Sequence, residues 1–218
     1  MSDDRPLTAE KLAFFGAISA SLSHELKNVL ATINEYSGLL DDLSHAARSG
    51  RKLEPERLEK ICAKIGAQVG RGEKLLGGLN RFSHSVDEPR AKVDLVALVR
   101  DITTLCQRFA SLRQVTLETR FPDAGQPVTT DPFACQHAIY LCIDMALAAA
   151  SQARHLTVLL DTDGGPPRII IESADPFERG LAPVRAELLD AVLSQCGARA
   201  SWTAEPGRDR VALSFAGG

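Results

Sequence analysis

The sequence lacks a strong excess of charge of either sign, a long hydrophobic run and a basic N-terminus. Its 218 residues carry a formal net charge of −3, which offers no general basic surface for nucleic acid. The longest weakly polar stretch, residues 138–150, is too short to cross a bilayer and contains Asp144, so it predicts a buried core helix. The start, MSDDRPLTAE, lacks the basic region of a secretion signal. We therefore expect a cytoplasmic protein with neither nucleic acid nor a membrane as a partner.

Cysteine pairs with metal-binding spacing are also absent. The five cysteines are odd in number and form no Cys-x-x-Cys motif: Cys62, Cys106, Cys135, Cys142 and Cys196. Such a set favours free thiols in a reducing cytosol over disulfides or a metal site. We therefore expect no bound metal.

The sequence changes character once, near residues 83–92. Two long helical patterns precede this segment, and helices alternate with strands after it. Pro89 and its polar neighbours are typical of a short linker. We predict an α+β chain with a helical domain in residues 1–88 and a second domain in residues 89–218.

The first domain has the pattern of an antiparallel helical hairpin. Apolar residues recur in steps of three and four over more than four heptads, with one small polar position. This seam contains Leu12, Phe15, Ser19, Leu22, Leu26, Val29, Ile33, Tyr36, Leu40 and Leu43. After a polar loop, Pro55 is well placed in the first turn of a second helix. That helix continues the seam with Leu58, Ile61, Ile65, Leu75, Leu79 and Phe82.

A hairpin with one apolar stripe per helix cannot cover its own seam, so we predict a homodimer in which two hairpins form a four-helix bundle. The second helix also contains Gly66, Gly70, Gly72, Gly77 and Gly78. Each glycine costs about 1 kcal/mol relative to alanine in a helix interior. Either close packing compensates this cost, or the helix frays.

The second domain alternates helical and strand patterns. Helices are predicted over residues 95–109, 132–150 and 182–196. Strands are predicted over residues 115–121, 156–161 and 168–172 and near 199–203 and 210–215, between turn signals such as DGGPP. This order indicates a two-layer α/β sandwich, in which helices cover one face of a mixed sheet.

His24 lies two residues after Leu22 and two before Leu26, both of which belong to the seam. At about 100° per residue, it falls roughly 160° from each, on the face opposite the bundle core. Small or polar residues share this stripe, and we expect them to form a partner-binding surface: Ala17, Ala20, Ser21, Lys27 and Ala31.

The residues beside His24 suit nucleophilic chemistry. Neutral imidazole is a competent nucleophile because its reference pKa is about 6.5. The carboxylate of Glu25 can accept a ring proton, and the amide of Asn28, one turn on, can orient a water. Spacing alone predicts equally well a solvated polar face with an incidental histidine.

The segment from Ser23 to Asn28, SHELKN, closely resembles the H-box of two-component histidine kinases, and the resemblance covers the hairpin from Leu7 to about Val86. It implies that His24 is the phosphoacceptor, that Glu25 is its acid/base partner and that Asn28 assists phosphatase activity. Val29 stands where the family usually has a proline that kinks the helix.

The resemblance continues, weakened, into the second domain. Residues 93–95, 130–132, 144–147 and 204–207 look like the VDL, ADP, DNAL and SEPG segments of the Bergerat-type ATP-binding fold. The ligand residues of that family are replaced: Met145 and Leu141 stand for asparagines, Ser173 for the adenine-binding aspartate, and Asp175 and Phe177 for glycines. Methionine is a poor ligand for Mg²⁺. We therefore expect no ATP, no autokinase activity and no cofactor, with Mg²⁺ only on a partner receiver domain.

The resemblance implies a histidine phosphotransferase in a bacterial two-component phosphorelay. His24 would accept a phosphoryl group from the receiver aspartate of a hybrid histidine kinase and pass it to a response regulator. One alternative is a response-regulator phosphatase or pseudokinase that uses Asn28. Another is a non-catalytic dimeric scaffold that binds receiver domains.

Overall fold

The computed structural model describes residues 4–149, 154–162, 165–175, 183–205 and 207–215. Two long helices come first, α1 (Asp4–Arg48) and α2 (Pro55–His84). The chain forms two compact units, one of residues 19–80 and one of residues 1–18 with 81–218. The limits of these units thus fall within α1 and within α2. The predicted domain boundary between residues 88 and 89 stays a prediction from sequence.

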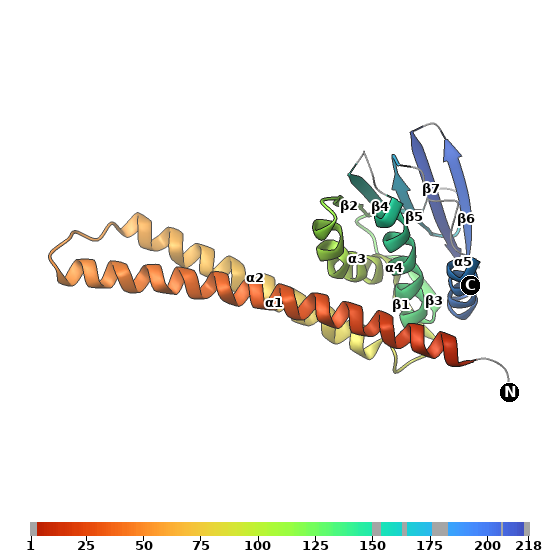
Figure 1. The fold of residues 1–218 in the computed structure, drawn as a ribbon, viewed down its shortest axis with the longest axis horizontal. Coiled ribbons are helices and arrows are strands. Elements are labelled where there is room, and N and C mark those ends of the chain that lie inside the picture. Colours follow the sequence, from red (N-terminus) through yellow and green to blue (C-terminus); the bar gives the residue numbers. More distant parts are fainter. Residues whose placement is uncertain (1–3, 150–153, 163–164, 176–182, 206, 216–218) are drawn as a thin grey trace. The chain divides into compact units, whose positions relative to one another are not determined.

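Residues 19–80 form the antiparallel hairpin that the sequence predicts, and the two helices run side by side (Figure 1). Residues nearer the start of α1 contact residues nearer the end of α2, and residues further along α1 contact residues nearer the start of α2. Arg71 contacts Glu25, whereas the Lys64 ammonium lies 5.1 Å from the centre of the Tyr36 ring. Gly50, with φ of 85°, ends α1 in the left-handed conformation that favours glycine.

The hairpin core consists of Leu22, Val29, Ile61 and Leu75, and the other seam residues of this unit are half-buried. Gly72 is buried, and a Cβ there would lie 3.5 Å from Val29 Cγ1. That distance is an ordinary van der Waals contact, so an alanine would fit there, and packing within one hairpin does not require this glycine.

The sandwich unit contains the predicted mixed sheet. Its strands are β2 (Thr116–Arg120), β4 (His155–Asp161), β5 (Arg168–Ser173), β6 (Ala198–Glu205) and β7 (Arg208–Phe215), in the order β2-β4-β5-β7-β6. Only the β2–β4 pair is parallel in this sheet. Alternate residues of β5 and β7 are buried, on the face covered by α3 (Leu95–Leu112), α4 (Pro132–Ala149) and α5 (Pro183–Cys196) (Figure 1). The α+β prediction is confirmed.

A second, two-stranded sheet was not predicted. It pairs β1 (Ala91–Asp94) with β3 (Pro127–Thr130) in antiparallel register. Each strand has only four residues, too few for an alternating pattern to stand out, and proline begins the second strand.

An aromatic cluster fixes the ends of α1 and α2 within the sandwich unit. Phe14 stacks on the His137 ring of α4 at 4.5 Å and meets Phe82 edge-on at 5.3 Å. Phe14 and Ile18 are therefore buried, whereas Leu12, predicted in the seam, is 69% exposed. The seam prediction was wrong at Leu12 because contact with α4, rather than with α2 alone, selects the buried face.

Helix α4 is the single helix of the described residues that is long and apolar enough to cross a membrane, and 72% of it is buried in the fold. It is therefore the core helix that the sequence predicts.

Candidate functional site

His24 lies in the hairpin unit, on the exposed face of α1. The neighbouring seam residues turn the other way, since Leu22 is buried and Leu26 is half-buried. Within the part of the chain that the structure describes, the His24 imidazole has no hydrogen-bond or ion-pair partner. Both ring nitrogens are thus available to another molecule.

The carboxylate of Glu25 is held by the second helix of the hairpin. Arg71 Nη2 lies 2.5 Å from Glu25 Oε2, and Asn28 Nδ2 donates to Glu25 Oε1 over 3.5 Å. Only 20% of the Glu25 side chain is exposed, whereas Arg71 is largely exposed. Glu25 therefore lies in an ion pair beside His24, and its contacts in this structure are with Arg71 and Asn28 rather than with the imidazole.

Arg71 was missed in the sequence analysis. It lies 46 residues from Glu25, and its contact depends on the register between the two helices, which the spacing within one helix does not reveal. The sequence signal that could have found Arg71 is its charge, opposite to that of Glu25, once the seams of the two helices are aligned.

The residues predicted to bind a partner do not all share the exposed face. Ala20, Lys27 and Ala31 are exposed, and Ala17, which belongs to the other compact unit, is half-buried. Ser21 is only 5% exposed, and its hydroxyl has no hydrogen-bond partner among the described residues. The prediction that Ser21 lies on the partner-binding surface was wrong, because this position is next to Leu22 at the edge of the buried stripe.

The charged neighbours of His24 come from both helices of the hairpin. Lys27 is exposed three residues from His24, on a neighbouring position of the same helix. The Arg71 guanidinium of α2 is paired with the Glu25 carboxylate, so its charge is already neutralised. The exposed Lys27 is therefore the cation that this stretch of α1 offers, and the exposed Asn28 amide lies one turn from His24.

The positions aligned with kinase nucleotide ligands are apolar or already paired. Met145 is 8% exposed, within the core of α4, and Leu141 is half-buried. Asp144 forms ion pairs with Arg113 at 2.9 Å and Arg185 at 3.5 Å. Its carboxylate is thus neutralised by arginines.

The segment that aligns with the adenine-binding motif of the kinase family is described only as far as Asp175. The Ser173 hydroxyl accepts a hydrogen bond from the backbone N–H of Asp175 over 3.1 Å, and both residues are buried. Phe177 and the neighbouring Pro176 lie outside the described residues. In the described ranges, no group of three His, Cys, Asp or Glu side chains could hold a metal ion.

The cysteines are free, as expected, and only Cys62 is exposed. Burial raises the pKa of the other four thiols, that of Cys196 to about 11. These four thiols are therefore protonated at neutral pH and unreactive.

Comparisons with known proteins concern the fold alone. No family profile and no curated protein matches the sequence. The catalytic domain of histidine kinase ThkA matches with a TM-score of 0.50 and 9% identity, over 58% of this chain and 95% of that one. The sandwich has the fold of a histidine kinase catalytic domain.

Two longer matches have lower scores. Acinetobacter baumannii histidine kinase AdeS has a TM-score of 0.49 and 14% identity, over 88% of this chain and 96% of that one. A bacterial phosphotransferase has a TM-score of 0.47 and 13% identity, over 98% of both chains. The histidine-kinase-like fold expected from the H-box resemblance is confirmed, on the catalytic-domain match.

Proposed function

We propose that the chain is a histidine phosphotransferase of a bacterial two-component phosphorelay that carries a phosphoryl group on His24 without binding ATP. The observation that carries this proposal is the exposed His24 imidazole, beside the Glu25–Arg71 pair, on a hairpin joined to a kinase-like sandwich. The same chain has an apolar Met145 where the kinase resemblance calls for a metal ligand.

In the proposed reaction, a phosphorus–nitrogen bond to His24 replaces a phosphorus–oxygen bond to a receiver aspartate. A lone pair on a His24 ring nitrogen attacks the phosphorus of a receiver aspartyl phosphate, and the phosphorus–oxygen bond to the aspartate breaks. The free carboxylate leaves, and the imidazolium loses its remaining N–H proton to solvent or to a nearby carboxylate. Transfer onward to a response regulator is the reverse reaction on a second aspartate. Mg²⁺ is supplied by the receiver domain.

The residues around His24 position this reaction. The small side chains of Ala20 and Ala31 leave room for a receiver to approach the imidazole. The exposed Lys27 ammonium stabilises the charge of the phosphoryl oxygens in transit. The Glu25 carboxylate is paired with Arg71, and in this proposal it acts as acid/base partner of His24 only after leaving that pair.

The nucleotide chemistry is lost in this proposal because the described positions that align with kinase ligands offer no group to hold a triphosphate. Asp144 is already paired with two arginines, and Met145 offers no oxygen ligand for Mg²⁺. Without the metal and its ligands, phosphoryl transfer from ATP lacks its main source of charge stabilisation. We therefore propose that the sandwich carries no kinase activity.

We further propose that the working form is a cytoplasmic homodimer. The half-buried seam of the hairpin and exposed apolar residues beside it give a second hairpin a surface to cover; these exposed residues are Leu30, Leu39, Val69 and Leu76. Two such hairpins complete a four-helix bundle and leave the His24 faces outside.

The function is tested by incubating the full chain with a phosphorylated receiver domain and Mg²⁺. We expect an acid-labile phosphohistidine that His24→Ala abolishes, with transfer reduced by at least about a thousandfold because no other residue replaces the nucleophile. His45→Ala, at an exposed histidine of the same helix, is the matched control and should transfer normally. Normal relay by His24→Ala would refute the proposal and leave the scaffold function.

A phosphatase is the second candidate, because the Asn28 amide is exposed one turn from His24. We expect Asn28→Ala to keep phosphotransfer within about threefold, since the amide is not the nucleophile. The measurement follows phosphate release separately from His24 labelling. If Asn28→Ala blocks release and no phosphohistidine forms in the unaltered chain, the chain is a phosphatase instead.

A further inference from the structure

The strand β6 forms one edge of the five-stranded sheet (Figure 1). Among the described strands, β7 is its only neighbour, so one side of β6 keeps a row of backbone N–H and C=O groups without a strand partner. Such an edge can pair with a further strand, and proteins usually block it with prolines, charges or a short edge strand.

The opposite edge of the sheet is blocked in this way, whereas β6 is not. The edge strand β2 has five residues and carries charge in its middle, since Glu118 Oε2 lies 3.4 Å from His155 Nε2 and 3.7 Å from Arg120 Nη2. Strand β6 has eight residues, and its central segment, residues 200–204 (ASWTA), contains no charge and no proline. The β6 edge is therefore open to pairing.

The second half of β6 is uncovered on both faces, since residues 201–205 are all exposed. Side chains alternate along a strand, so Ala198, Ala200, Trp202 and Ala204 share the face on which α5 packs. On that face Ala198 is buried and Ala200 is half-buried, but Trp202 is 44% exposed. A tryptophan exposed on an open strand edge gives a partner an apolar surface to cover.

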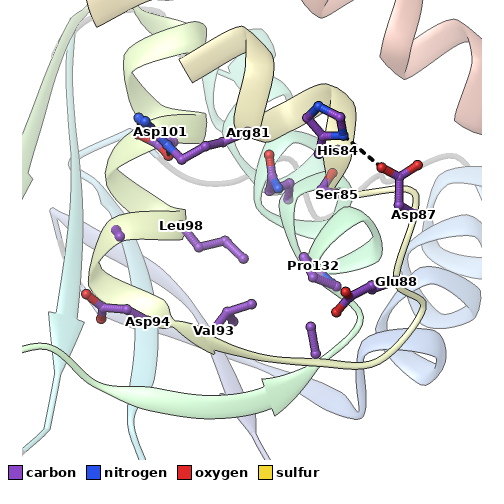
Figure 2. Close-up of a pocket in the computed structure, with 13 residues that line it drawn as sticks. Arg81, His84, Ser85, Asp87, Glu88, Val93, Asp94, Leu98, Asp101 and Pro132 are labelled. Atoms are coloured by element: carbon purple, nitrogen blue, oxygen red, sulfur yellow. Dashed lines mark hydrogen bonds and ion pairs between the residues drawn. The ribbon is translucent and has the colours of Figure 1, made fainter. Parts of the chain in front are cut away.

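Ion pairs satisfy many charged side chains of the sandwich unit. Figure 2 shows His84 beside Asp87 at the end of α2, where the His84 Nδ1 atom lies 2.8 Å from Asp87 Oδ2. In the same region Arg81 binds Asp101 through two contacts of 2.5 and 2.7 Å. Charges without such a partner therefore stand out in this unit.

Arg199 and Glu205 are two charges of this kind. Arg199 lies near the start of β6 and Glu205 at its end, and both are exposed on the face away from the helices. Neither forms an ion pair with any residue in the described part of the chain. Each end of β6 thus presents one unpaired charge, and the two charges have opposite signs.

The sequence of β6 is complementary to itself in an antiparallel register. If a second copy of the strand pairs with β6 about a two-fold axis at Trp202, each Arg199 lies opposite a Glu205 of the other copy. Opposite side chains of antiparallel strands share a face, with Cβ atoms about 4.5–5.5 Å apart, which allows an ion pair. Moving the axis by one residue loses both charge pairs, because Arg199 then lies opposite Thr203 or beyond Glu205.

We propose that β6 pairs with β6 of a second copy of this chain in the register centred on Trp202. Backbone hydrogen bonds, two Arg199–Glu205 pairs and contact between the Trp202 side chains hold the copies together, and the two sheets become one continuous sheet. This edge belongs to a different compact unit from the hairpin seam, and its pairing does not rest on the phosphotransferase function.

Trp202 is the single tryptophan of the chain, so its fluorescence reports on this edge. The test records the emission of the full chain over a range of concentrations, with iodide as a quencher. We expect the emission to move to shorter wavelength and the quenching to fall as copies pair, with a midpoint on the order of 100 µM, because two edge strands bury little surface. Emission and quenching that do not change up to about 1 mM would overturn the proposal.

Charge reversal tests the register. Arg199→Glu and Glu205→Arg each place like charges opposite one another at two positions, and each should weaken association about tenfold. The double variant Arg199→Glu/Glu205→Arg restores both pairs with their signs exchanged and should associate like the unaltered chain. Asp123→Arg, at an exposed aspartate that follows β2, is the matched control and should associate normally. Unchanged association in both single variants, or no recovery in the double variant, would contradict the assigned register.

A last arm separates this association from the proposed pairing of hairpins. Leu40→Glu alters the seam of residues 19–80 and should keep the concentration-dependent change in Trp202 emission. Loss of that change in Leu40→Glu would assign it to the hairpins and overturn the pairing of β6.

Discussion

The hairpin unit and the sandwich unit differ in how completely they bury their own apolar residues. In residues 19–80, the buried large apolar side chains are Leu22, Val29, Ile61 and Leu75, while much of the seam stays half-buried. The sandwich unit covers its sheet with α3, α4 and α5, and buries every second residue of β5 and β7. The sandwich unit therefore has a closed core, and the hairpin unit has an open seam, meaning a row of apolar side chains that it only half buries.

The residues that stabilise the sandwich unit are therefore not the residues that the proposed chemistry needs. A closed core can lose nucleotide ligands and still fold, because packing and not the ligand stabilises it. Met145 is an example: its side chain belongs to the core, at a position where the kinase resemblance requires a metal ligand. In the proposed function, the hairpin presents His24 on its exposed face and leaves its half-buried seam for a second hairpin.

The largest effect is expected from a core substitution in the sandwich unit. Phe82 is 1% exposed and contacts Phe14, Phe15 and Phe133. Phe82→Ala should lower the free energy of unfolding by about 3–5 kcal/mol, through lost burial and the cavity left behind. Urea denaturation measures this loss. Phe82→Leu, which retains most of the volume, should lose much less, and equal losses would show that the cluster is not packed as described.

His137 adds a pH dependence to the same cluster. Burial, and to a lesser degree the charge of Lys11, lowers the pKa of His137 to about 4. An unfolded histidine titrates near 6.5, so between these values the unfolded state binds more protons. Stability should therefore fall as the pH decreases from 6.5 to 4, by up to about 3 kcal/mol.

Denaturation of the full chain across this pH range checks the prediction. His137→Phe keeps a ring stacked on Phe14 and should remove most of the slope. Lys11→Met should shift the lower end of the transition to higher pH, because a repelling charge is gone. A slope that survives in His137→Phe would place the titrating group elsewhere.

Elements with long periodic patterns were predictable from the sequence, and so was the exposure expected for His24. The short strands β1 and β3 were not, because four residues carry too little periodicity. The choice of Phe14 over Leu12 for the core depends on α4, more than a hundred residues away, so no local pattern contains it. The Arg71 contact and the place of β6 at the edge of the sheet likewise depend on which elements meet in the fold.

The smallest expected effect sharpens the comparison between the open and the closed unit. Leu40 is a half-buried seam residue of α1 in the hairpin unit. In the proposed dimer, Leu40→Glu places a charge in the interface between hairpins, which should weaken association at least about thirtyfold, or roughly 2 kcal/mol. Sedimentation of the full chain over a range of concentrations measures the dissociation constant.

The matched control is Leu112→Glu, at an exposed leucine that ends α3 in the closed unit. Because this side chain is already in water and away from the seam, the same change of chemistry should leave association unaltered. Equal weakening by both variants would mean that added charge, rather than the seam, controls association. No weakening by Leu40→Glu would mean that the open seam of residues 19–80 is covered by something other than a second hairpin.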